Sequence, residues 1–334
     1  MTTTVLSVDD YCVAIVCALD KELFAVRALF DQRHRGLPKP PQDPNHYALG
    51  QIGTNNIVAA SLPVGEYGGN SASSVVTHLL RSFHFVRFCL LVGIGGGAPS
   101  RLHDIRLGDV VVSQPTGTSP GVLQYDLGKT MQDGSFVPTG SLQRPPRVLL
   151  TAVSSIKSDP DLSANPLSKY IERITQLKPD YRYPGRHLDM LFAPDTEHNI
   201  AETTCKRCNG PWVKRRHRAT TQPVIHYGLI ASGNQVVKSP HLRDRLRDEH
   251  EILCFEMEAA GVMNSIPCLV IEESLTMLIR IKTAYGRNML PPRLQRIQNY
   301  YSHIFSSQFT PVSLWSIGVS KTQRWSLHLR RTRP

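Results

Sequence analysis

The apolar residues of the chain fall into unbroken runs and helical spacings that alternate along most of its length. Residues 11–19 (YCVAIVCAL) form a nearly continuous apolar run with β-branched side chains, which is typical of a strand buried on both faces of a sheet. Asp20 can cap the next segment, whose apolar side chains recur at helical spacing and predict a helix over about residues 20–33. Such alternation indicates a layered α/β domain. The same patterns predict strands at 46–53, 56–64, 85–92, 109–113, 224–231, 252–255 and 268–271, and helices at 68–83, 240–249 and 257–264.

Residues 159–222 interrupt this order with polar, proline-containing sequence. We interpret them as an insertion or a long excursion from a single core, because they offer no second apolar pattern. The basic cluster at 214–218 could contact nucleic acid, but a solvated loop is the commoner arrangement. Structural zinc sites usually show two tight ligand pairs, whereas this region offers one, Cys205 and Cys208, with His198 and His217 nearby. The two cysteines are therefore weak metal candidates, and the alternative is that they simply belong to an inserted loop.

The composition is that of a folded protein. The 334 residues are 41% hydrophobic and 19% charged, which excludes a chain that is disordered over its whole length. The seven cysteines are an odd number scattered through apolar runs, so they fit a reduced setting better than a disulfide framework, and we expect a cytoplasmic protein. No apolar stretch approaches the ~20 residues of a membrane helix. Residues 1–10, which we expect to be an N-terminal tail, lack the pattern of a signal peptide.

The formal net charge of +11 is unevenly distributed. Residues 271–334 contain ten basic and two acidic side chains, so this stretch alone carries +8. A basic chain can bind nucleic acid or an anionic membrane. Because the excess lies in one terminal stretch and the rest of the chain is close to neutral, we expect neither nucleic acid nor a membrane as a partner.

A glycine cluster follows the predicted strand at 85–92. Gly93, Gly95 and Ala98 nominally match the dinucleotide-binding fingerprint, but Pro99 follows at once and leaves no place for the phosphate-binding helix. A glycine loop can bring backbone N–H groups close to an anion or a ribose, and it can equally be a plain structural turn.

Two carboxylates, Glu256 and Glu258, lie just past another predicted strand. Carboxylates at the end of a strand can accept hydrogen bonds from ribose hydroxyls. An acidic first helical turn, stabilised by the helix dipole, gives the same spacing, and spacing alone favours this second interpretation.

Five segments carry a further signal when they are taken together and in order. They are residues 13–23 (VAIVCALDKEL), 90–99 (LLVGIGGGAP), 105–113 (IRLGDVVVS), 228–236 (GLIASGNQV) and 254–261 (CFEMEAAG). In these segments the chain resembles the nucleoside phosphorylase superfamily of purine and uridine phosphorylases and adenosylhomocysteine-type nucleosidases, above all the domain at the front of larger fungal signalling proteins. The resemblance covers residues 11–271 and implies a three-layer α/β/α sandwich with a mixed central sheet.

The resemblance also implies an activity, cleavage of the N-glycosidic bond of a small-molecule purine nucleoside or nucleotide. Glu22 matches the carboxylate that activates water in hydrolytic members. Met257 and Glu258 match the pair that holds the ribose, with Leu19 where a second methionine is usual. The remaining matches are the anion or water loop, Gly93, Gly95, Gly96 and Gly97, and the base-binding segment, Ser232, Gly233, Asn234, Val236 and Val237.

One departure from the family bears on the type of reaction. Phosphorolytic members generally place an arginine two residues before the first glycine of the loop, and this chain has Leu91 there. We therefore favour hydrolysis, although Arg27, Arg87 or Arg101 could supply charge for phosphate as a co-substrate. The resemblance implies no other cofactor, and it is compatible with a homo-oligomer.

The resemblance stops at about Ile271. Family members continue with Gly-Ile-Ser-Asp-Tyr-Ala-Asp or similar, in which the first Asp neutralises the departing purine, whereas this chain continues with EESLTML. Permitted codons for residues 272–289, read from the third base of the Glu272 codon, can encode the expected continuation. We therefore expect residues 272–334 to be an out-of-frame, poorly ordered basic tail. The missing acid leaves two alternatives, a weakened enzyme or a non-catalytic purine-sensing or interaction domain derived from a larger signalling protein.

Overall fold

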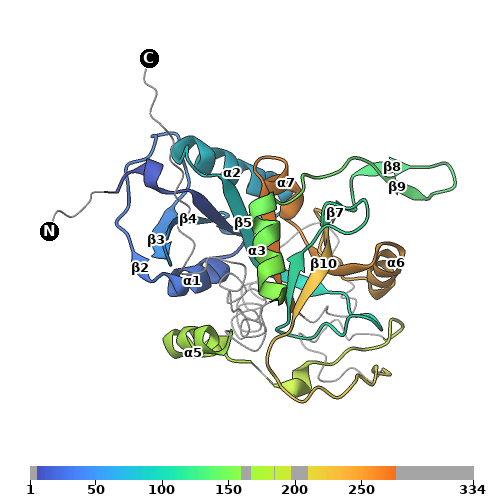
Figure 1. Ribbon diagram of the computed structural model, residues 1–334. Helices are drawn as coiled ribbons and strands as arrows, with labels where there is room; N and C mark the ends of the chain where they lie inside the picture. Colours follow the sequence, from blue (N-terminus) through green and yellow to red (C-terminus); the bar gives the residue numbers. More distant parts are fainter. Residues whose placement is uncertain (1–5, 159–166, 184, 197–209, 276–334) are drawn as a thin grey trace, which may run out of the picture.

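A mixed sheet forms the centre of the computed structural model, which describes residues 6–158, 167–183, 185–196 and 210–275 (Figure 1). Among these residues the strand order is β11-β10-β6-β12-β5-β1-β4-β3-β2, with β7 paired to β10, and β8 and β9 form a separate hairpin. The strands are β1 (Val13–Cys17), β2 (Gln32–Arg33), β3 (Tyr47–Ile52), β4 (Asn55–Ser61), β5 (Phe88–Gly97), β6 (Val110–Ser113), β7 (Val122–Gln124), β8 (Gly128–Thr130), β9 (Phe136–Pro138), β10 (Ile225–Ser232), β11 (Ile252–Glu256) and β12 (Cys268–Leu275).

The first apolar run of the sequence is a central strand, as predicted. All residues of β1 are buried, and β1 pairs in parallel with β4 on one side and with β5 on the other. Helix α1 (Asp20–Leu29) follows, but it ends four residues before the predicted position. The chain leaves the helix because Phe30 is buried against Gly50, and Gln32–Arg33 then pairs as β2 with β3.

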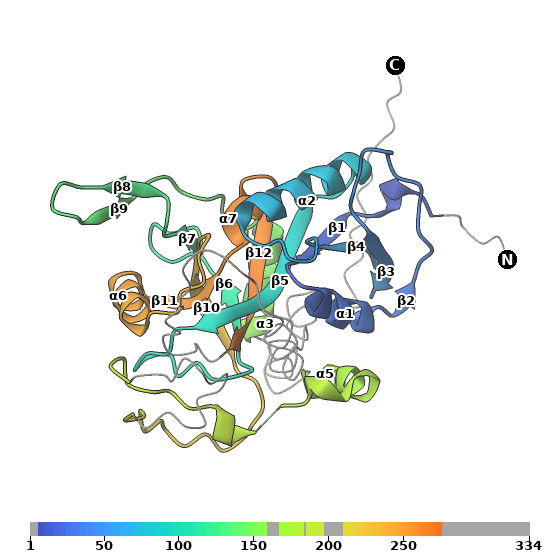
Figure 2. The same ribbon diagram turned by 180° about the vertical axis from the view of Figure 1, so that it is seen from behind.

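Helices cover both faces of the sheet (Figures 1 and 2). Helices α2 (Gly69–Ser82) and α7 (Ala259–Met263) pack against the apolar core of one face. Helices α1, α3 (Arg147–Ser158) and α5 (Leu167–Leu177) contribute to the core of the opposite face. Helix α6 (Pro240–His250) packs on a third apolar cluster next to β11. This arrangement confirms the predicted α/β/α sandwich. No helix in the described part of the chain is long and apolar enough to span a membrane.

Strand β5 closes part of the sheet into a ring. Its end pairs with β11 in the antiparallel sense, with Gly96 opposite Phe255 and Gly97 opposite Cys254. Strands β5, β12, β6, β10 and β11 are therefore each paired to the next in a closed circuit. The predicted glycine loop is wrong, because the cluster lies inside β5. A side chain on Gly95 would overlap the Sγ of Cys254, so glycine is what allows β5 to pass so close to β11.

Strand β12 also continues beyond the end predicted for it at residue 271. It pairs in parallel with β5 as far as Leu275 and in the antiparallel sense with β6, and it buries Glu272, Glu273 and Ser274. Two adjacent glutamates normally mark an exposed position, so their sequence predicts an end where the strand in fact continues. The rest of the predicted out-of-frame tail, residues 276–334, lies outside the described residues.

Candidate functional site

Glu22 stands at the junction of β1 and α1, with its carboxyl group turned back toward the sheet. One carboxylate oxygen accepts hydrogen bonds from the backbone N–H groups of Ala18 and Leu19, at 2.7 and 2.9 Å. The other accepts a hydrogen bond from the N–H of Ile94 in β5, at 3.1 Å. The residue is only 1% exposed. Three backbone donors from two neighbouring strand regions thus fix this carboxyl group in place.

Glu256 is the last residue of β11 and Glu258 lies two residues further along the chain, and the two have different partners. Glu256 accepts hydrogen bonds from the N–H groups of Glu258 and Ala259, both at 2.8 Å, and so caps the short helix α7. Glu258 accepts a hydrogen bond from the N–H of Gly68, at 2.9 Å, just before α2. Neither glutamate lies in the first turn of α7, as the alternative of an acidic helical turn predicted; Glu256 ends β11 and caps the helix from outside, while Glu258 joins two separate loops.

Glu272 is a site residue that sequence reasoning missed. The pairing of β12 with β5 places it opposite Gly93, and a Cβ on Gly93 would lie 2.9 Å from one of its carboxyl oxygens. The residue is 2% exposed, and its Oε2 has no hydrogen-bond partner. The available signal was a glutamate directly after the apolar run at 268–271. We refer to Glu22, Glu256, Glu258 and Glu272 as the carboxyl cluster.

Burial raises the pKa values throughout the carboxyl cluster. The pKa of Glu22 rises to about 8, because burial outweighs its backbone hydrogen bonds and Glu258 adds a like charge. Burial and the adjacent Glu258 raise the pKa of Glu256 to about 7, and burial also raises that of Glu258. Burial, followed by the three other carboxyl groups, raises the pKa of Glu272 well above its ordinary value. Burial and the neighbouring like charges therefore favour the protonated form of each of these four carboxyl groups.

The ion pairs that arginines form in the described part of the chain all lie outside the carboxyl cluster. Arg27 and Arg87, two of the candidates for holding phosphate, are exposed. Arg101, the third, lines a separate cavity that includes no member of the cluster. The site is thus rich in carboxyl groups, and no arginine among the described residues pairs with it.

The predicted base-binding segment follows β10 and approaches the cluster through a glycine pair. Asn234 accepts a hydrogen bond from the N–H of Gly69 at 3.2 Å, next to the Gly68 that contacts Glu258. Ser232 Oγ accepts a hydrogen bond from the N–H of Ala260 in α7, at 3.0 Å. Gly68 and Gly69 are further residues that sequence reasoning missed, and a glycine pair ahead of a helix was the only signal for them.

The other predicted site residues are distributed unevenly around the cluster. Met257 is partly buried between Glu256 and Glu258, and Leu19 is partly buried where its N–H reaches Glu22. Gly233 donates its N–H to the carbonyl oxygen of Glu256, at 3.2 Å. Of the two valines, Val237 is buried and Val236 is 61% exposed, so only the first packs into the fold.

No group of three or more histidine, cysteine or acidic side chains that could hold a metal ion occurs in the part of the chain that the structure describes. The weak metal candidates Cys205 and Cys208 lie outside the described residues.

Comparison with curated proteins gives one relative of high similarity. The chain is 40% identical over 271 residues to a nucleotide-binding leucine-rich repeat (NLR)-like protein of Hyaloscypha variabilis. The match covers 80% of this chain, but the chain spans only about a quarter (26%) of the length of that relative. No protein-family model matches the chain.

Comparison with solved structures identifies the fold. The futalosine hydrolase of Helicobacter pylori matches with a TM-score of 0.53 at 15% identity, over 92% of this chain and 97% of that one. A 5′-methylthioadenosine/S-adenosylhomocysteine nucleosidase of Colwellia psychrerythraea, in complex with adenine, matches with a TM-score of 0.51 at 14% identity, over 94% and 97% of the two chains. A putative nucleosidase of the same kind from Francisella philomiragia has a TM-score of 0.51 at 15% identity, over 91% and 97%. The chain therefore has the fold of these nucleosidases.

Proposed function

We propose that this chain is a member of the nucleoside phosphorylase superfamily, and that the carboxyl cluster is its site for cleaving the N-glycosidic bond of a purine nucleoside. The observation that carries the proposal is the buried Glu22, held by three backbone N–H groups beside Gly93 and in the same cluster as Glu258. The nucleosidase fold supports the proposal, as does the adenine in the Colwellia psychrerythraea complex.

Each proposed role follows from the chemistry of a side chain. Glu22 has a pKa of about 8, so its ionised form, whose fraction grows as the pH rises through this value, is the base that would take a proton from water. Glu258, next to the glycine pair, would accept hydrogen bonds from ribose hydroxyls, and Met257 would pack against the sugar. The sugar becomes positively charged as the bond breaks, and nearby carboxylates stabilise such a charge.

The charge of the site favours water over phosphate as the nucleophile. Phosphate recognition usually relies on bidentate arginine, and none of the arginine ion pairs among the described residues involves the cluster. Glu272 instead adds a carboxyl group beside Gly93, where the resemblance places the anion or water. We therefore propose hydrolysis rather than phosphorolysis.

The leaving-group acid of the family is missing, which favours a second candidate function. Glu272, Glu273 and Ser274 occupy β12 where the resemblance would lead into the loop with the acid. Without that acid the departing purine keeps its charge, so turnover is expected to be slow. A domain that binds purine without cleaving it would fit the similarity to an NLR-like protein, of which the chain spans a quarter.

Free purine released in phosphate-free buffer separates these functions. Adenosine, 5′-methylthioadenosine and S-adenosylhomocysteine would be incubated with the full chain for hours, and the base measured by chromatography. Release without phosphate supports hydrolysis, and release that strictly requires phosphate contradicts it. A rise in melting temperature with adenosine but no release identifies the sensing function, because a ligand that binds only the folded state stabilises it.

Sequencing the transcript around Ile271 tests the hypothesis that residues 272–334 are translated out of frame, since codons incompatible with the shift would end it.

A further inference from the structure

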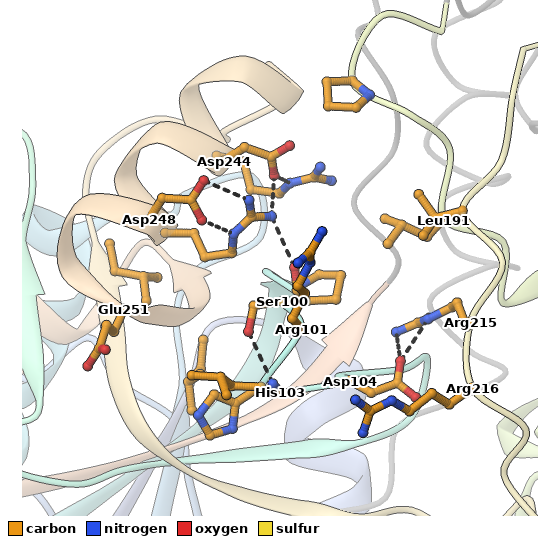
Figure 3. A pocket seen from close by; sticks show the side chains of 18 of the residues that line it. Ser100, Arg101, His103, Asp104, Leu191, Arg215, Arg216, Asp244, Asp248 and Glu251 are labelled. Carbon is orange, nitrogen blue, oxygen red and sulfur yellow. Dashed lines mark hydrogen bonds and ion pairs between the residues drawn. The ribbon is translucent and has the colours of Figure 1, made fainter.

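A cavity with a volume of about 1020 Å³ lies away from the carboxyl cluster (Figure 3). Its walls are the loop after β5, helix α6 with the start of β11, and two stretches of the 159–222 excursion, at 191–194 and 213–216. It shares no lining residue with the carboxyl cluster. Ligand pockets of proteins are typically about 300–1,000 Å³, so this cavity could hold a molecule the size of a nucleotide.

Three of the arginines that line the cavity are neutralised by acidic neighbours. Arg215 pairs with Asp104, and Arg243 and Arg247 both pair with Asp244 on α6. Arg247 also pairs with Asp248 and donates to the carbonyl oxygen of Pro99, at 3.0 Å. These pairs fix the walls and leave little charge for a ligand.

Three further cations line the same cavity without an ion pair among the described residues, namely Arg101, Lys214 and Arg216. All three are exposed, and they come from two segments of the lining, the loop after β5 and the stretch at 213–216. Figure 3 shows Arg101 between helix α6 and the stretch that carries Leu191 and Arg215. Of the acidic residues that line the cavity, only Glu251 and Asp104 lie outside α6, and Asp104 is already paired.

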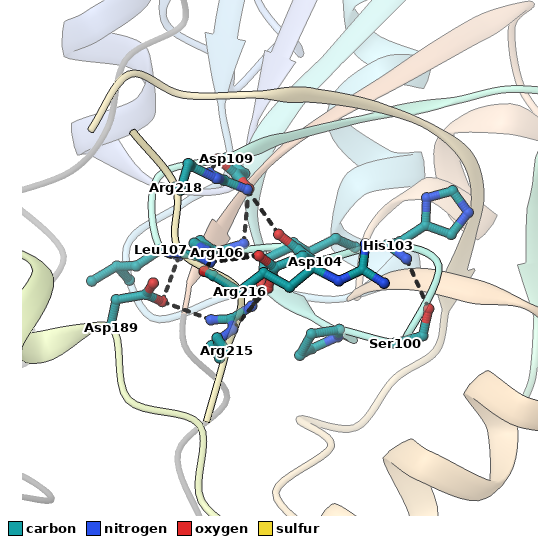
Figure 4. A network of polar contacts seen from close by, with 12 residues as sticks. Ser100, His103, Asp104, Arg106, Leu107, Asp109, Asp189, Arg215, Arg216 and Arg218 are labelled. Carbon is teal, nitrogen blue, oxygen red and sulfur yellow. Dashed lines mark hydrogen bonds and ion pairs between the residues drawn. The ribbon is translucent and has the colours of Figure 1, made fainter. Parts of the chain in front are cut away.

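The stretch that carries Lys214 and Arg216 is anchored by the arginines that alternate with them (Figure 4). Arg215 binds Asp104 and Asp189, the second at 3.0 Å. Arg218 makes two hydrogen bonds to the buried Asp109, at 2.7 and 2.9 Å. Since these two guanidinium groups are held by the core, Lys214 and Arg216 are presented at defined positions.

The cavity also has an apolar part. Leu102 lies next to Arg101 and is 84% exposed, and Val213 lies next to Lys214 and is 43% exposed. Leu191 and Phe192 line the cavity from the neighbouring stretch, where the N–H of Val213 donates to the carbonyl oxygen of Leu191 at 2.7 Å. Large apolar side chains left open to water beside unpaired cations suit a ligand with an anionic group and an apolar or aromatic group.

We propose that this cavity binds an organic phosphate of nucleotide size, with its phosphates at Arg101, Lys214 and Arg216 and its ring against Leu102 and Val213. Guanidinium groups bind phosphate oxygens through paired hydrogen bonds, and an ammonium group adds a point charge. The site is independent of the proposed glycosidic cleavage.

ATP is the probe that tests this site, with binding to the full chain measured by calorimetry at low and moderate salt. Arg101→Glu and Arg216→Glu should each weaken ATP binding by about tenfold or more, because each removes a charge-assisted contact. The matched control is Arg245→Glu, an exposed arginine of α6 that does not line the cavity, and it should leave the affinity within about twofold. Tripolyphosphate, which lacks the ring, should bind more weakly than ATP, and added salt should weaken both.

Three results would overturn the proposal. The first is ATP affinity that is equal in the charge-reversal variants and the control, or no measurable binding in any of them. The second is ATP binding that Glu258→Gln abolishes, since this would place the nucleotide in the carboxyl cluster. The third is equal affinity for tripolyphosphate and ATP, which would leave the apolar wall without a role. Because the readout is ATP binding and not purine release, failure of the glycosidase proposal would leave this test unaffected.

Discussion

At the residue scale, a buried glutamate without a cation must either keep its proton or reduce the stability of the fold. Glu22 relieves part of this cost with three backbone donors, whereas Glu272 has an oxygen without a hydrogen-bond partner. The pKa of Glu22 is about 8 in the folded chain against an ordinary 4.5, so the folded state binds more protons between these two pH values. The free energy of unfolding therefore falls as the pH rises through this window.

Replacing Glu22 by glutamine should separate stability from activity. Relative to the parent chain, we expect Glu22→Gln to gain on the order of a few kcal/mol in free energy of unfolding between pH 4.5 and pH 8, because only the parent loses stability through this window. The amide nitrogen cannot accept a hydrogen bond from the backbone N–H groups that bind both oxygens of Glu22, so the variant also carries a loss that is the same at both pH values. Purine release should fall by about 10²–10⁴-fold, since the base is lost. Urea unfolding at the two pH values, with the exposed Glu172→Gln of α5 as control, checks the first part. Equal stability changes at both pH values would contradict a buried, protonated Glu22.

Sequence reasoning singled out Glu22 only through the family resemblance and Glu258 through both the resemblance and its place after a predicted strand, and it missed their neighbour Glu272. The reason is physical, because Glu272 reaches the site through the pairing of β12 with β5, and residues 93 and 272 are adjacent only in the sheet. The hydrogen bond from Gly68 to Glu258 likewise joins residues 190 positions apart. Such contacts depend on topology, which local spacing does not encode.

At the scale of elements, the apolar runs predicted the central strands, while the glycine cluster was misinterpreted. Glycine is rare inside strands, so Gly93 to Gly97 were read as a loop. In the structure they are strand residues because β11 and β12 lie too close to β5 for side chains there. The short strands β7, β8 and β9 and the helices α3 and α5 were not predicted either.

Two glycines of the crowded strand β5, Gly93 and Gly95, differ in how well they would tolerate a side chain. On Gly95 a Cβ would meet the buried Sγ of Cys254 and, at 3.0 Å, the carbonyl oxygen of Phe255, whereas on Gly93 it would first meet the carboxyl end of Glu272. We expect Gly95→Ala to lower the free energy of unfolding by about 1–3 kcal/mol. Gly93→Ala should cost less, because the end of a side chain can move more easily than a strand. Thermal unfolding of both variants tests this, and a larger loss for Gly93→Ala would contradict the packing described for β5 and β11.

At the scale of the whole molecule, the 159–222 excursion is joined to the sheet through Asp109, just before β6. This buried carboxylate accepts hydrogen bonds from Arg218, from His226 in β10 at 3.1 Å, and from the N–H groups of Val224 and Arg106, at 2.9 and 2.8 Å. Burial alone would raise the pKa of Asp109, but the hydrogen bonds from His226 and Arg218 lower it below its ordinary value. Its contribution to stability is therefore present above the ordinary pKa of 3.8 and is lost as the pH falls through the lower folded value.

Replacing Asp109 by asparagine should loosen this connection. We expect Asp109→Asn to reduce the free energy of unfolding by about 3–5 kcal/mol at pH 7, because Arg218 loses the carboxylate that balances its charge. Limited proteolysis should then cleave more rapidly near the basic cluster at 214–218. The control Asp133→Asn removes an exposed carboxylate of the β8–β9 turn and should change neither property. Unchanged protease sensitivity in Asp109→Asn would mean that the excursion is held by other contacts.

The position of β12 has a consequence for how the chain is made. The last described strand lies in the middle of the sheet, between β5 and β6, and it completes the circuit of five paired strands. Synthesis from the N-terminus produces every neighbour of β12 first, and until residues 268–275 leave the ribosome both β5 and β6 have an unpaired edge. The circuit of five strands therefore cannot close gradually, and we expect the nascent domain to need protection from aggregation until β12 inserts.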